Sequence, residues 1–256
     1  MSIERVAVIG AGVMGSGIAA QIANAGKKVL LLDIVPDGAS NRNVIAEGAI
    51  QKLLKVKPAA LMHKRNAKHI TAGNLEDHLA GLADVDWIIE VIIERLDLKQ
   101  ALYKKIDSVR KANCIISSNT STLPLADLTA DMPDSFTRNF LITHFFNPPR
   151  YMRLVEIVQG PNTRQESVDT LNYFCDHHLG KGVVKCNDTP GFIANRIGAY
   201  WMQTALLEAI RLELTIDEAD ALCGKPMGIP KTGVFGLMDL VGIDIMPHIL
   251  ASMTHS

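Results

Sequence analysis

Residues 6–15 read VAVIGAGVMG, a short apolar run that leads into three glycines with the spacing GxGxxG. The apolar run from Val6 to Ile9 predicts a buried β-strand. From Met14 to Ala25, apolar side chains recur every four residues, which predicts an α-helix that ends at Gly26. A glycine-rich turn between a strand and a helix is the first half of a dinucleotide-binding unit.

Each glycine of this turn has a distinct role in such a unit. Gly10 makes the tight turn, Gly12 lets the backbone approach a pyrophosphate, and Gly15 lets the helix pack closely on the strand. The N-terminus of the helix then offers free N–H groups and a positive dipole to phosphates. The alternative interpretation is a turn that only packs a strand against a helix.

Asp33 ends the next apolar run and follows Gly15 by 18 residues, close to the spacing that ribose recognition requires. A carboxylate at this position accepts hydrogen bonds from the ribose 2′-hydroxyl of NAD and repels the 2′-phosphate of NADP. Ile34, rather than an arginine, follows it. The sequence therefore predicts NAD as the cofactor, the alternative being a merely solvated carboxylate.

Strand and helix patterns alternate along the first 187 residues. Further strand candidates are Val29–Leu32, Trp87–Val91, Cys114–Ser117, Phe140–Thr143, Leu154–Val158 and Val183–Cys186. This alternation predicts an α/β fold with a mostly parallel, doubly wound sheet of the Rossmann type. Only helical patterns follow Cys186. We therefore expect an NAD-binding domain over residues 1–187 and a smaller all-helical domain over residues 188–256.

Two capping signals are expected in the helical part. Thr189 stands before Pro190, so it can cap a long helix that runs on to Leu214 with a broad apolar face. The residues Thr215-Ile216-Asp217-Glu218 match a capping box and predict the start of another helix.

The composition is typical of a globular protein, with 48% hydrophobic residues, 21% charged residues and a net charge of −1. It predicts no nucleic-acid partner. The apolar residues 6–20 imitate a signal peptide, but they are too short for a membrane span and contain helix-weakening glycines. The four cysteines are scattered without a CxxC motif, which favours reduced thiols in a cytoplasmic protein over disulfides or a zinc site.

Polar residues lie at or just past the C-terminal ends of three of the predicted strands. They are Glu90 and Glu94, then Ser118-Asn119-Thr120-Ser121, then His144 and Asn147. The carboxyl ends of the strands in a doubly wound sheet form the edge where ligands bind. Each residue alone is explained as a loop polar group, whereas their convergence on one edge indicates a site.

Glu156 lies within Leu154–Val158, which is otherwise apolar. A carboxylate buried there needs a partner, because an unpaired buried charge is very costly. Pro148-Pro149 links this strand to the preceding one, so the two strands can lie side by side and His144 can be that partner. A histidine oriented by a carboxylate is a general base. The alternative is that Glu156 faces outward from an edge strand.

The chain resembles the L-3-hydroxyacyl-CoA dehydrogenase family over essentially its whole length. The strings that carry the resemblance are VIGAGVMGSGIA at residues 8–19, SSNTST at 117–122, HFFNPPRYMRLVE at 144–156 and DTPGFIANR at 188–196. It is similar in particular to the corresponding module of bacterial multifunctional fatty-acid oxidation proteins.

The resemblance implies a role for each matching residue. His144 would remove the 3-hydroxyl proton while hydride leaves C3 for the nicotinamide, and Glu156 would orient His144. Ser121 and Asn195 match residues that hydrogen-bond the reacting substrate. The residues that match the family's cofactor contacts are Gly10, Gly12, Gly15, Asp33, Glu94, Lys99 and Asn147. The implied reaction is NAD-dependent oxidation of (S)-3-hydroxyacyl-CoA to 3-ketoacyl-CoA in fatty-acid β-oxidation.

The stretch from Lys52 to Lys68 holds six lysines or arginines and no acidic residue. In the family this region is a helical hairpin that touches the CoA end of the acyl-CoA substrate. The alternative is a solvated basic face.

The helical domain is shorter than in the family, so we expect a truncated module with weak turnover. The resemblance also allows a homodimer and, in multifunctional proteins, a fused enoyl-CoA hydratase domain. Two alternatives stay open: a dehydrogenase of a free hydroxy acid or sugar acid, and a non-catalytic NAD-binding relative. The intact set of Ser121, His144, Glu156 and Asn195 argues against the second.

Overall fold

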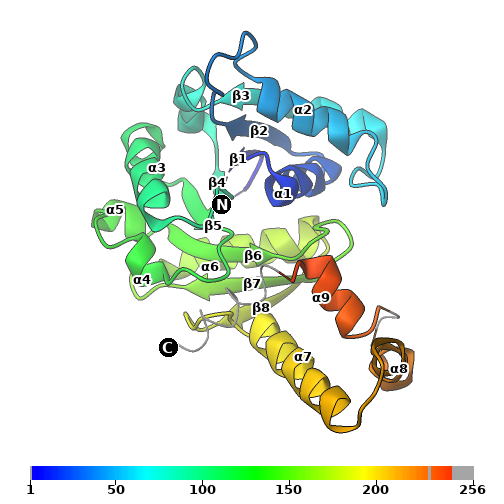
Figure 1. The fold of residues 1–256 in the computed structure, drawn as a ribbon. Helices are drawn as coiled ribbons and strands as arrows, with labels where there is room; N and C mark the ends of the chain where they lie inside the picture. The colour runs from blue at the N-terminus through cyan, green and yellow to red at the C-terminus, as the bar shows by residue number, and fades with distance from the viewer. Residues whose placement is uncertain (1, 230–231, 244–256) are drawn as a thin grey trace. The chain divides into compact units, whose positions relative to one another are not determined.

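The computed structural model describes residues 2–229 and 232–243 (Figure 1). The chain divides into two compact units, one that extends to Asp188 and one that begins at Thr189. The division falls one residue beyond the boundary expected from the sequence.

The first unit is built on one eight-stranded sheet with the order β3-β2-β1-β4-β5-β6-β7-β8. The strands are β1 Arg5–Ile9, β2 Lys28–Asp33, β3 Ile70–Asn74, β4 Trp87–Glu90, β5 Ile115–Ser118, β6 Phe140–Phe145, β7 Leu154–Gln159 and β8 Gly182–Cys186. All neighbours from β3 to β6 are parallel, β7 runs antiparallel to β6, and β8 is parallel to β7. The order reverses at β1, which confirms the predicted doubly wound sheet.

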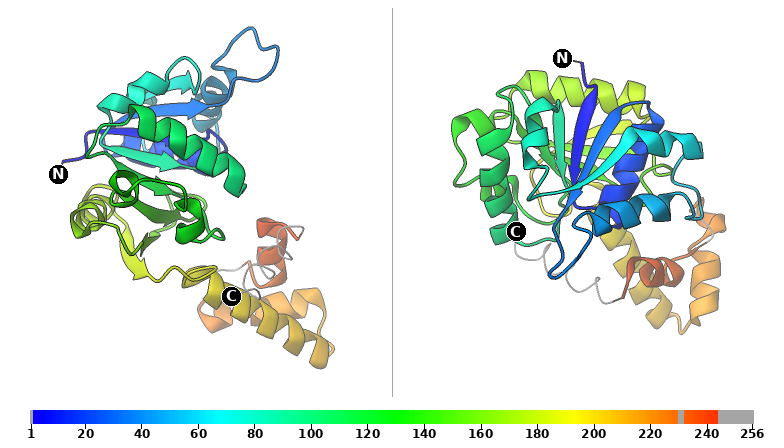
Figure 2. Two further views of the ribbon diagram at one scale, coloured as in Figure 1. Left: turned by 90° about the vertical axis from the view of Figure 1, so that its left-hand side faces the viewer. Right: turned by 90° about the horizontal axis from the view of Figure 1, so that it is seen from above.

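Helices cover both faces of this sheet (Figure 2). They are α1 Val13–Asn24, α2 Val44–Leu53, α3 Leu96–Val109, α4 Leu125–Leu128, α5 Asp134–Thr137 and α6 Gln165–Tyr173, with short 3₁₀ helices η1 Lys64–His69 and η2 Leu79–Asp84 and a π-helical turn η3 Phe174–His178. On one face, Val6 and Val8 of β1 share a buried cluster with Ile18 of α1 and Leu171 of α6. Each fully buried aliphatic side chain contributes about 1.5–3 kcal/mol to this core.

The opposite face carries an aromatic cluster around α3. The ring of Tyr103 lies 5.6 Å from that of Phe136 and 5.2 Å from that of Phe140, measured between centroids. All three side chains are fully buried. This packing fixes α3 against α5 and β6, so the polar groups that α3 presents are held rigidly.

The second unit contains α7 Ala194–Arg211, α8 Ile216–Leu222, the 3₁₀ turn η4 Lys225–Met227 and α9 Phe235–Val241. The capping box predicted at Thr215 is confirmed, since the Thr215 side chain accepts from the Glu218 N–H and the Glu218 carboxylate accepts from the Thr215 N–H. The Asp220 carboxylate accepts from the N–H groups of Phe235 and Gly236, at 2.6 and 2.9 Å, and so caps α9. Within the described residues of both units, no helix is long and apolar enough to cross a membrane.

Two local predictions are wrong. Thr189 does not cap a helix at Pro190, because Gly191 and Phe192 adopt positive φ angles of 74° and 47° and turn the chain, so that α7 begins only at Ala194. The stretch after Lys52 is not a helical hairpin either. The α2 helix ends at Leu53, and η1 provides only a short 3₁₀ segment.

Candidate active site

The glycine turn after β1 has the geometry of a dinucleotide cradle. Gly10 has a φ of 105°, and a Cβ atom there would lie 2.5 Å from the Val91 carbonyl oxygen. A Cβ atom on Gly15 would lie 1.7 Å from the Gly10 carbonyl oxygen, so only glycine permits this close approach of α1 and β1. A Cβ atom on Gly12 would meet no protein atom within 4 Å. Gly12 therefore leaves open space at the N-terminus of α1, where a pyrophosphate fits.

Asp33, at the end of β2, faces this turn. Its Oδ2 atom accepts a hydrogen bond of 2.5 Å from the Ala11 N–H, and its Oδ1 atom accepts one of 2.7 Å from the Ile34 N–H. The carboxylate is thus held at the edge of the glycine turn. Because the side chain is half-buried, its oxygens keep access to a ribose hydroxyl.

His144 and Glu156 lie directly opposite each other on the antiparallel strands β6 and β7. The His144 Nδ1 atom is 2.9 Å from the Glu156 Oε2 atom. Glu156 is fully buried and His144 is 6% exposed. β8 covers the outer side of β7, so Glu156 does not belong to an edge strand. The pairing expected from the sequence is therefore present, and the Phe146 ring packs 4.4 Å from the imidazole, between centroids.

A cavity of about 360 Å³ opens beside His144 at the carboxyl ends of β4, β5 and β6. Its walls bring together residues predicted from separate parts of the sequence: Glu94, Lys99, Ser121, His144 and Asn147. Asn119 also lines it, and its Oδ1 atom accepts a hydrogen bond of 2.9 Å from the Phe145 N–H. The strand after His144 is thereby fixed to the loop that carries Ser121.

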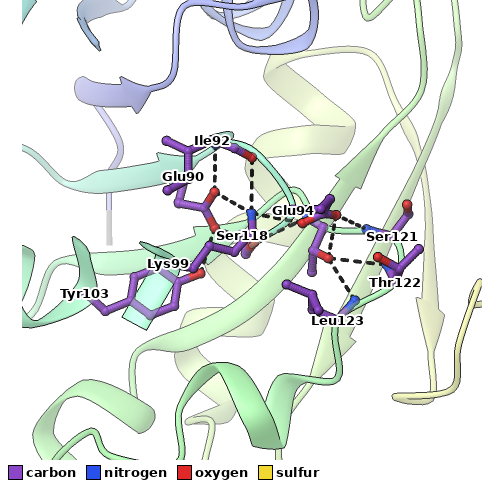
Figure 3. Close-up of polar contacts among 10 residues, drawn as sticks. Glu90, Ile92, Glu94, Lys99, Tyr103, Ser118, Ser121, Thr122 and Leu123 are labelled. Atoms are coloured by element: carbon purple, nitrogen blue, oxygen red, sulfur yellow. Dashed lines mark hydrogen bonds and ion pairs between the residues drawn. The ribbon is translucent and has the colours of Figure 1, made fainter. Parts of the chain in front are cut away.

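Glu94 and Lys99 belong to a larger polar network beneath this cavity (Figure 3). The Lys99 ammonium contacts the Glu90 Oε1 atom at 2.6 Å, the Glu94 Oε2 atom at 3.1 Å and the Ile92 carbonyl oxygen at 3.3 Å. Lys99 is only 1% exposed. Its three N–H groups are matched by three protein oxygens, so it contacts a cofactor only by exchanging one of them.

Tyr103 closes the far side of the same network. Its hydroxyl donates a hydrogen bond of 2.7 Å to the Glu90 Oε2 atom. Burial, and after it the negative charge of Glu90, raises the pKa of Tyr103 well above its ordinary value. The hydroxyl consequently stays protonated and acts as a donor. Its position four residues after Lys99 on α3 places both side chains on one helix face, a signal that the sequence contains.

The loop between β6 and β7, which carries Asn147, is anchored at three points. The buried Lys181 ammonium donates to the carbonyl oxygens of Pro149 and, at 2.7 Å, of Met152. The Arg150 guanidinium donates to the Ala59 and Leu61 carbonyl oxygens. Gly17 of α1 faces the Pro149 ring, from which a Cβ atom would be 2.9 Å away. The sequence gives no signal for Lys181, which follows Gly180 in a short connection.

A second, larger cavity of about 740 Å³ extends from the glycine turn along α2. Gly12, Asp33 and Asn147 line it, and much of its remaining wall is apolar, with Val44, Ile45, Leu53 and Val56. Two residues of the basic stretch, Lys52 and Lys57, also line it, whereas Lys55 and Lys64 do not. Only part of the positive charge of the basic stretch therefore faces the cavity.

Asn195 lies in the second unit, in the first turn of α7, and is half-buried. Its expected contact with the reacting substrate stays a prediction.

Comparison with known proteins identifies both units. The model for the NAD-binding domain of 3-hydroxyacyl-CoA dehydrogenase matches residues 5–189, and the model for the C-terminal domain of that enzyme matches residues 191–256. The chain is 46% identical, over 97% of its length and 72% of the relative's, to a probable 3-hydroxyacyl-CoA dehydrogenase of Deinococcus radiodurans. It is also 46% identical to a putative fatty acid oxidation complex trifunctional enzyme of Rickettsia felis, of which it covers 35%.

Solved structures give the same result. The 3-hydroxybutyryl-CoA dehydrogenase of Escherichia coli matches all of this chain with 53% of its own, at a TM-score of 0.83 and 30% identity. The (S)-3-hydroxybutyryl-CoA dehydrogenase PaaH1 of Ralstonia eutropha matches 98% of this chain with 87% of its own, at a TM-score of 0.79 and 29% identity. The glycine turn, the His144–Glu156 pair and these matches agree, and the chain belongs to the 3-hydroxyacyl-CoA dehydrogenase family.

Proposed function

We propose that this protein oxidises (S)-3-hydroxyacyl-CoA to 3-ketoacyl-CoA with NAD, as a step of fatty-acid β-oxidation. The observation that carries the proposal is the His144–Glu156 pair, buried side by side at the edge of a cavity that Ser121, Glu94 and Asn147 also line. A buried histidine–carboxylate pair is a general base, and the glycine turn with Asp33 fits a dinucleotide.

His144 takes the proton of the substrate's 3-hydroxyl group. Its Nδ1 atom is engaged with Glu156, so the proton is taken at Nε2. The Glu156 carboxylate fixes the tautomer of the ring and stabilises the imidazolium that forms. When bound, NAD supplies the acceptor for the hydride that leaves C3. Ser121 holds the oxygen on C3 while the carbonyl forms.

Ligand binding divides between the larger cavity and the smaller one beside His144. Gly10, Gly12 and Gly15 with Asp33 hold the cofactor's pyrophosphate and ribose, and Glu94, Lys99 and Asn147 hold the part nearer His144. Lys52 and Lys57, which also line the larger cavity, attract the phosphates of CoA, while the apolar wall along α2 accepts uncharged parts of the substrate.

The direct test is NADH consumption with acetoacetyl-CoA, compared with free acetoacetate at the same concentration. Turnover of the thioester and little of the free acid is the expected result. Equal turnover of both compounds would favour a dehydrogenase of free hydroxy acids. Longer 3-ketoacyl-CoAs then define the preferred acyl length.

Asp33→Ala is expected to weaken NAD binding by about 1–3 kcal/mol, the worth of a lost hydrogen bond to a charged group. The preference for NAD over NADP should narrow in the same variant, because the carboxylate that repels a 2′-phosphate is gone. Calorimetric titration with both cofactors measures the two effects. Equal affinity of the unmutated protein for NAD and NADP would contradict the assignment.

Charge reversal at both Lys52 and Lys57 is expected to raise the KM for acetoacetyl-CoA about tenfold, since each lost attraction is worth up to about 1 kcal/mol. NADH affinity should not change. Lys55→Glu is the matched control, because it reverses the same charge in the same stretch outside the cavity. If Lys55→Glu raises the KM as much as the double reversal at Lys52 and Lys57, the stretch acts only as a solvated basic face.

A further inference from the structure

Glu90 is a fully buried carboxylate that lies below the cavity and does not line it. Four donors satisfy its two oxygens. Its Oε1 atom accepts from the Lys99 ammonium at 2.6 Å and from the Ile92 N–H at 2.8 Å. Its Oε2 atom accepts from the hydroxyls of Tyr103 and Ser118, both at 2.7 Å. An ionised group held by four donors has one orientation only.

Glu90 in turn sets the position of Lys99. The Lys99 ammonium bridges two carboxylates, with Glu90 fully buried on one side and Glu94, whose side chain is 42% exposed, on the other. Because the contact with Glu90 is the shorter one and is completely buried, Glu90 is the fixed end of this bridge. Glu94 is the end that reaches the cavity.

Glu94 also holds the loop after β5 in place through two hydrogen bonds. Its Oε1 atom accepts from the Thr120 hydroxyl at 2.7 Å and from the Ser121 N–H at 3.2 Å. The Thr120 hydroxyl oxygen itself accepts from the N–H groups of Thr122 and Leu123 (Figure 3). A continuous chain of charged contacts thus leads from Glu90 through Lys99 and Glu94 to Ser121.

We propose that Glu90 is a positioning residue for the active site, acting through Lys99 to hold Glu94 and the Ser121 loop in their binding geometry. The inference rests on the proposed function, in which Glu94 holds the cofactor and Ser121 the substrate. Glu90 touches neither ligand in this scheme. It fixes the positions of Glu94 and of the Ser121 loop before cofactor and substrate bind.

Asp86, at the opposite end of β4, offers a natural comparison. Its carboxylate also binds a lysine, Lys111 at 2.6 Å, and two backbone N–H groups, those of Glu4 and Arg5. This pair lies at the amino end of the strand, away from the cavity. Asp86→Asn therefore removes a carboxylate–lysine pair directly before the same strand without touching the chain of contacts that leads to Ser121.

The experiment compares Glu90→Gln with Asp86→Asn in the full chain, by fluorescence titration with NADH, by acetoacetyl-CoA kinetics and by thermal melting. Glu90→Gln is expected to raise the Kd for NADH about tenfold, the effect of one misplaced hydrogen bond to a charged group. The kcat/KM for acetoacetyl-CoA should fall by at least as much. Asp86→Asn should lower the Tm by a smaller amount, because its pair with Lys111 is partly exposed, and should change neither constant by more than about twofold.

A second variant keeps the test decisive if Glu90→Gln does not fold. Tyr103→Phe removes one donor from Glu90 and keeps the aromatic packing around α3, so it should raise the Kd for NADH about threefold. In a Glu94→Gln background, Tyr103→Phe should not raise the Kd for NADH any further, because Tyr103 and Glu90 affect the cofactor only through the position of Glu94. If Tyr103 only stabilises the fold, Tyr103→Phe should lower the Tm by the same amount in both backgrounds. Its effect on the Kd for NADH should then not depend on whether Glu94 is present.

Unchanged NADH affinity and unchanged kcat/KM in a folded Glu90→Gln variant, or in Tyr103→Phe where Glu90→Gln does not fold, would overturn the positioning role alone. An unmutated protein that binds no NADH would overturn the proposed function and the positioning role together. The pH dependence of kcat also distinguishes the role of Glu90 from that of Glu156. It should keep its shape in Glu90→Gln, since Glu90 does not contact His144, and should change in Glu156→Gln.

Discussion

Replacing His144 with glutamine is expected to lower kcat about 10²–10⁴-fold, the usual worth of a general base. Glutamine is close to histidine in size and keeps a polar group near Glu156, so the fold and the cavity should survive. NADH affinity should stay within about twofold, because the bond that is lost forms only with the reacting hydroxyl. Stopped-flow turnover with acetoacetyl-CoA and titration with NADH measure the two quantities separately.

Glu156→Gln is the companion variant. It leaves His144 in place and removes the negative charge that lies 2.9 Å from Nδ1. Turnover should fall because the imidazolium is no longer stabilised and the tautomer is no longer fixed. Near-normal turnover of His144→Gln at saturating substrate would show that another group is the base.

The glycine turn provides the second large expected effect. In Gly15→Ala, the new methyl group would meet the Gly10 carbonyl oxygen at 1.7 Å, so α1 has to move away from β1. We expect a loss of about 3 kcal/mol or more in the free energy of unfolding, the upper range for overpacking, together with the loss of NADH binding. Urea denaturation and NADH titration measure the two effects.

Gly12→Ala is the matched control because its methyl group meets no protein atom within 4 Å. Gly12 has a φ of −65°, which alanine adopts freely, so the stability should change by no more than about 1 kcal/mol. NADH binding should nevertheless be strongly weakened, since the methyl group occupies the space of the pyrophosphate. Normal NADH affinity in Gly12→Ala would show that the cofactor does not lie on this turn.

Most of the sheet could be predicted because its strands are short apolar runs that end in glycine or polar residues. β3 could not, since Ile70–Asn74 reads ITAGN and contains one large apolar side chain. It occupies the edge of the sheet beside β2, and its buried residues other than Ile70 are Gly73 and Asn74, which give no apolar signal. Capping at Thr215 was predictable because a capping box is a local signal. The start of α7 was not, because a positive φ at Phe192 has no signature in a bulky residue.

The His144–Glu156 pairing was predictable because a lone carboxylate in an apolar strand has to find a partner. The contacts below the cavity were not predictable to the same degree. Glu90 reads as one more polar residue at a strand end, yet it is fully buried and faces Lys99 rather than solvent. Likewise, Asp33 was expected to meet only a ribose, whereas it also holds the Ala11 N–H. Such contacts depend on distances between distant segments, which a residue pattern does not contain.

The placement of the proposed base, His144, on β6 and of its carboxylate partner, Glu156, on β7 has a consequence for how the protein would lose activity. Their register is fixed by the backbone ladder that runs from Leu141 opposite Gln159 to Phe145 opposite Val155, in the interior of the sheet. Segments of this kind belong to the last cooperative unit to open in hydrogen exchange, and their amides exchange only when the whole domain unfolds. Loop fraying or loss of a surface helix leaves such a pair intact. The His144–Glu156 pair is therefore already formed in the folded domain, and the proposed base needs no ligand to orient it.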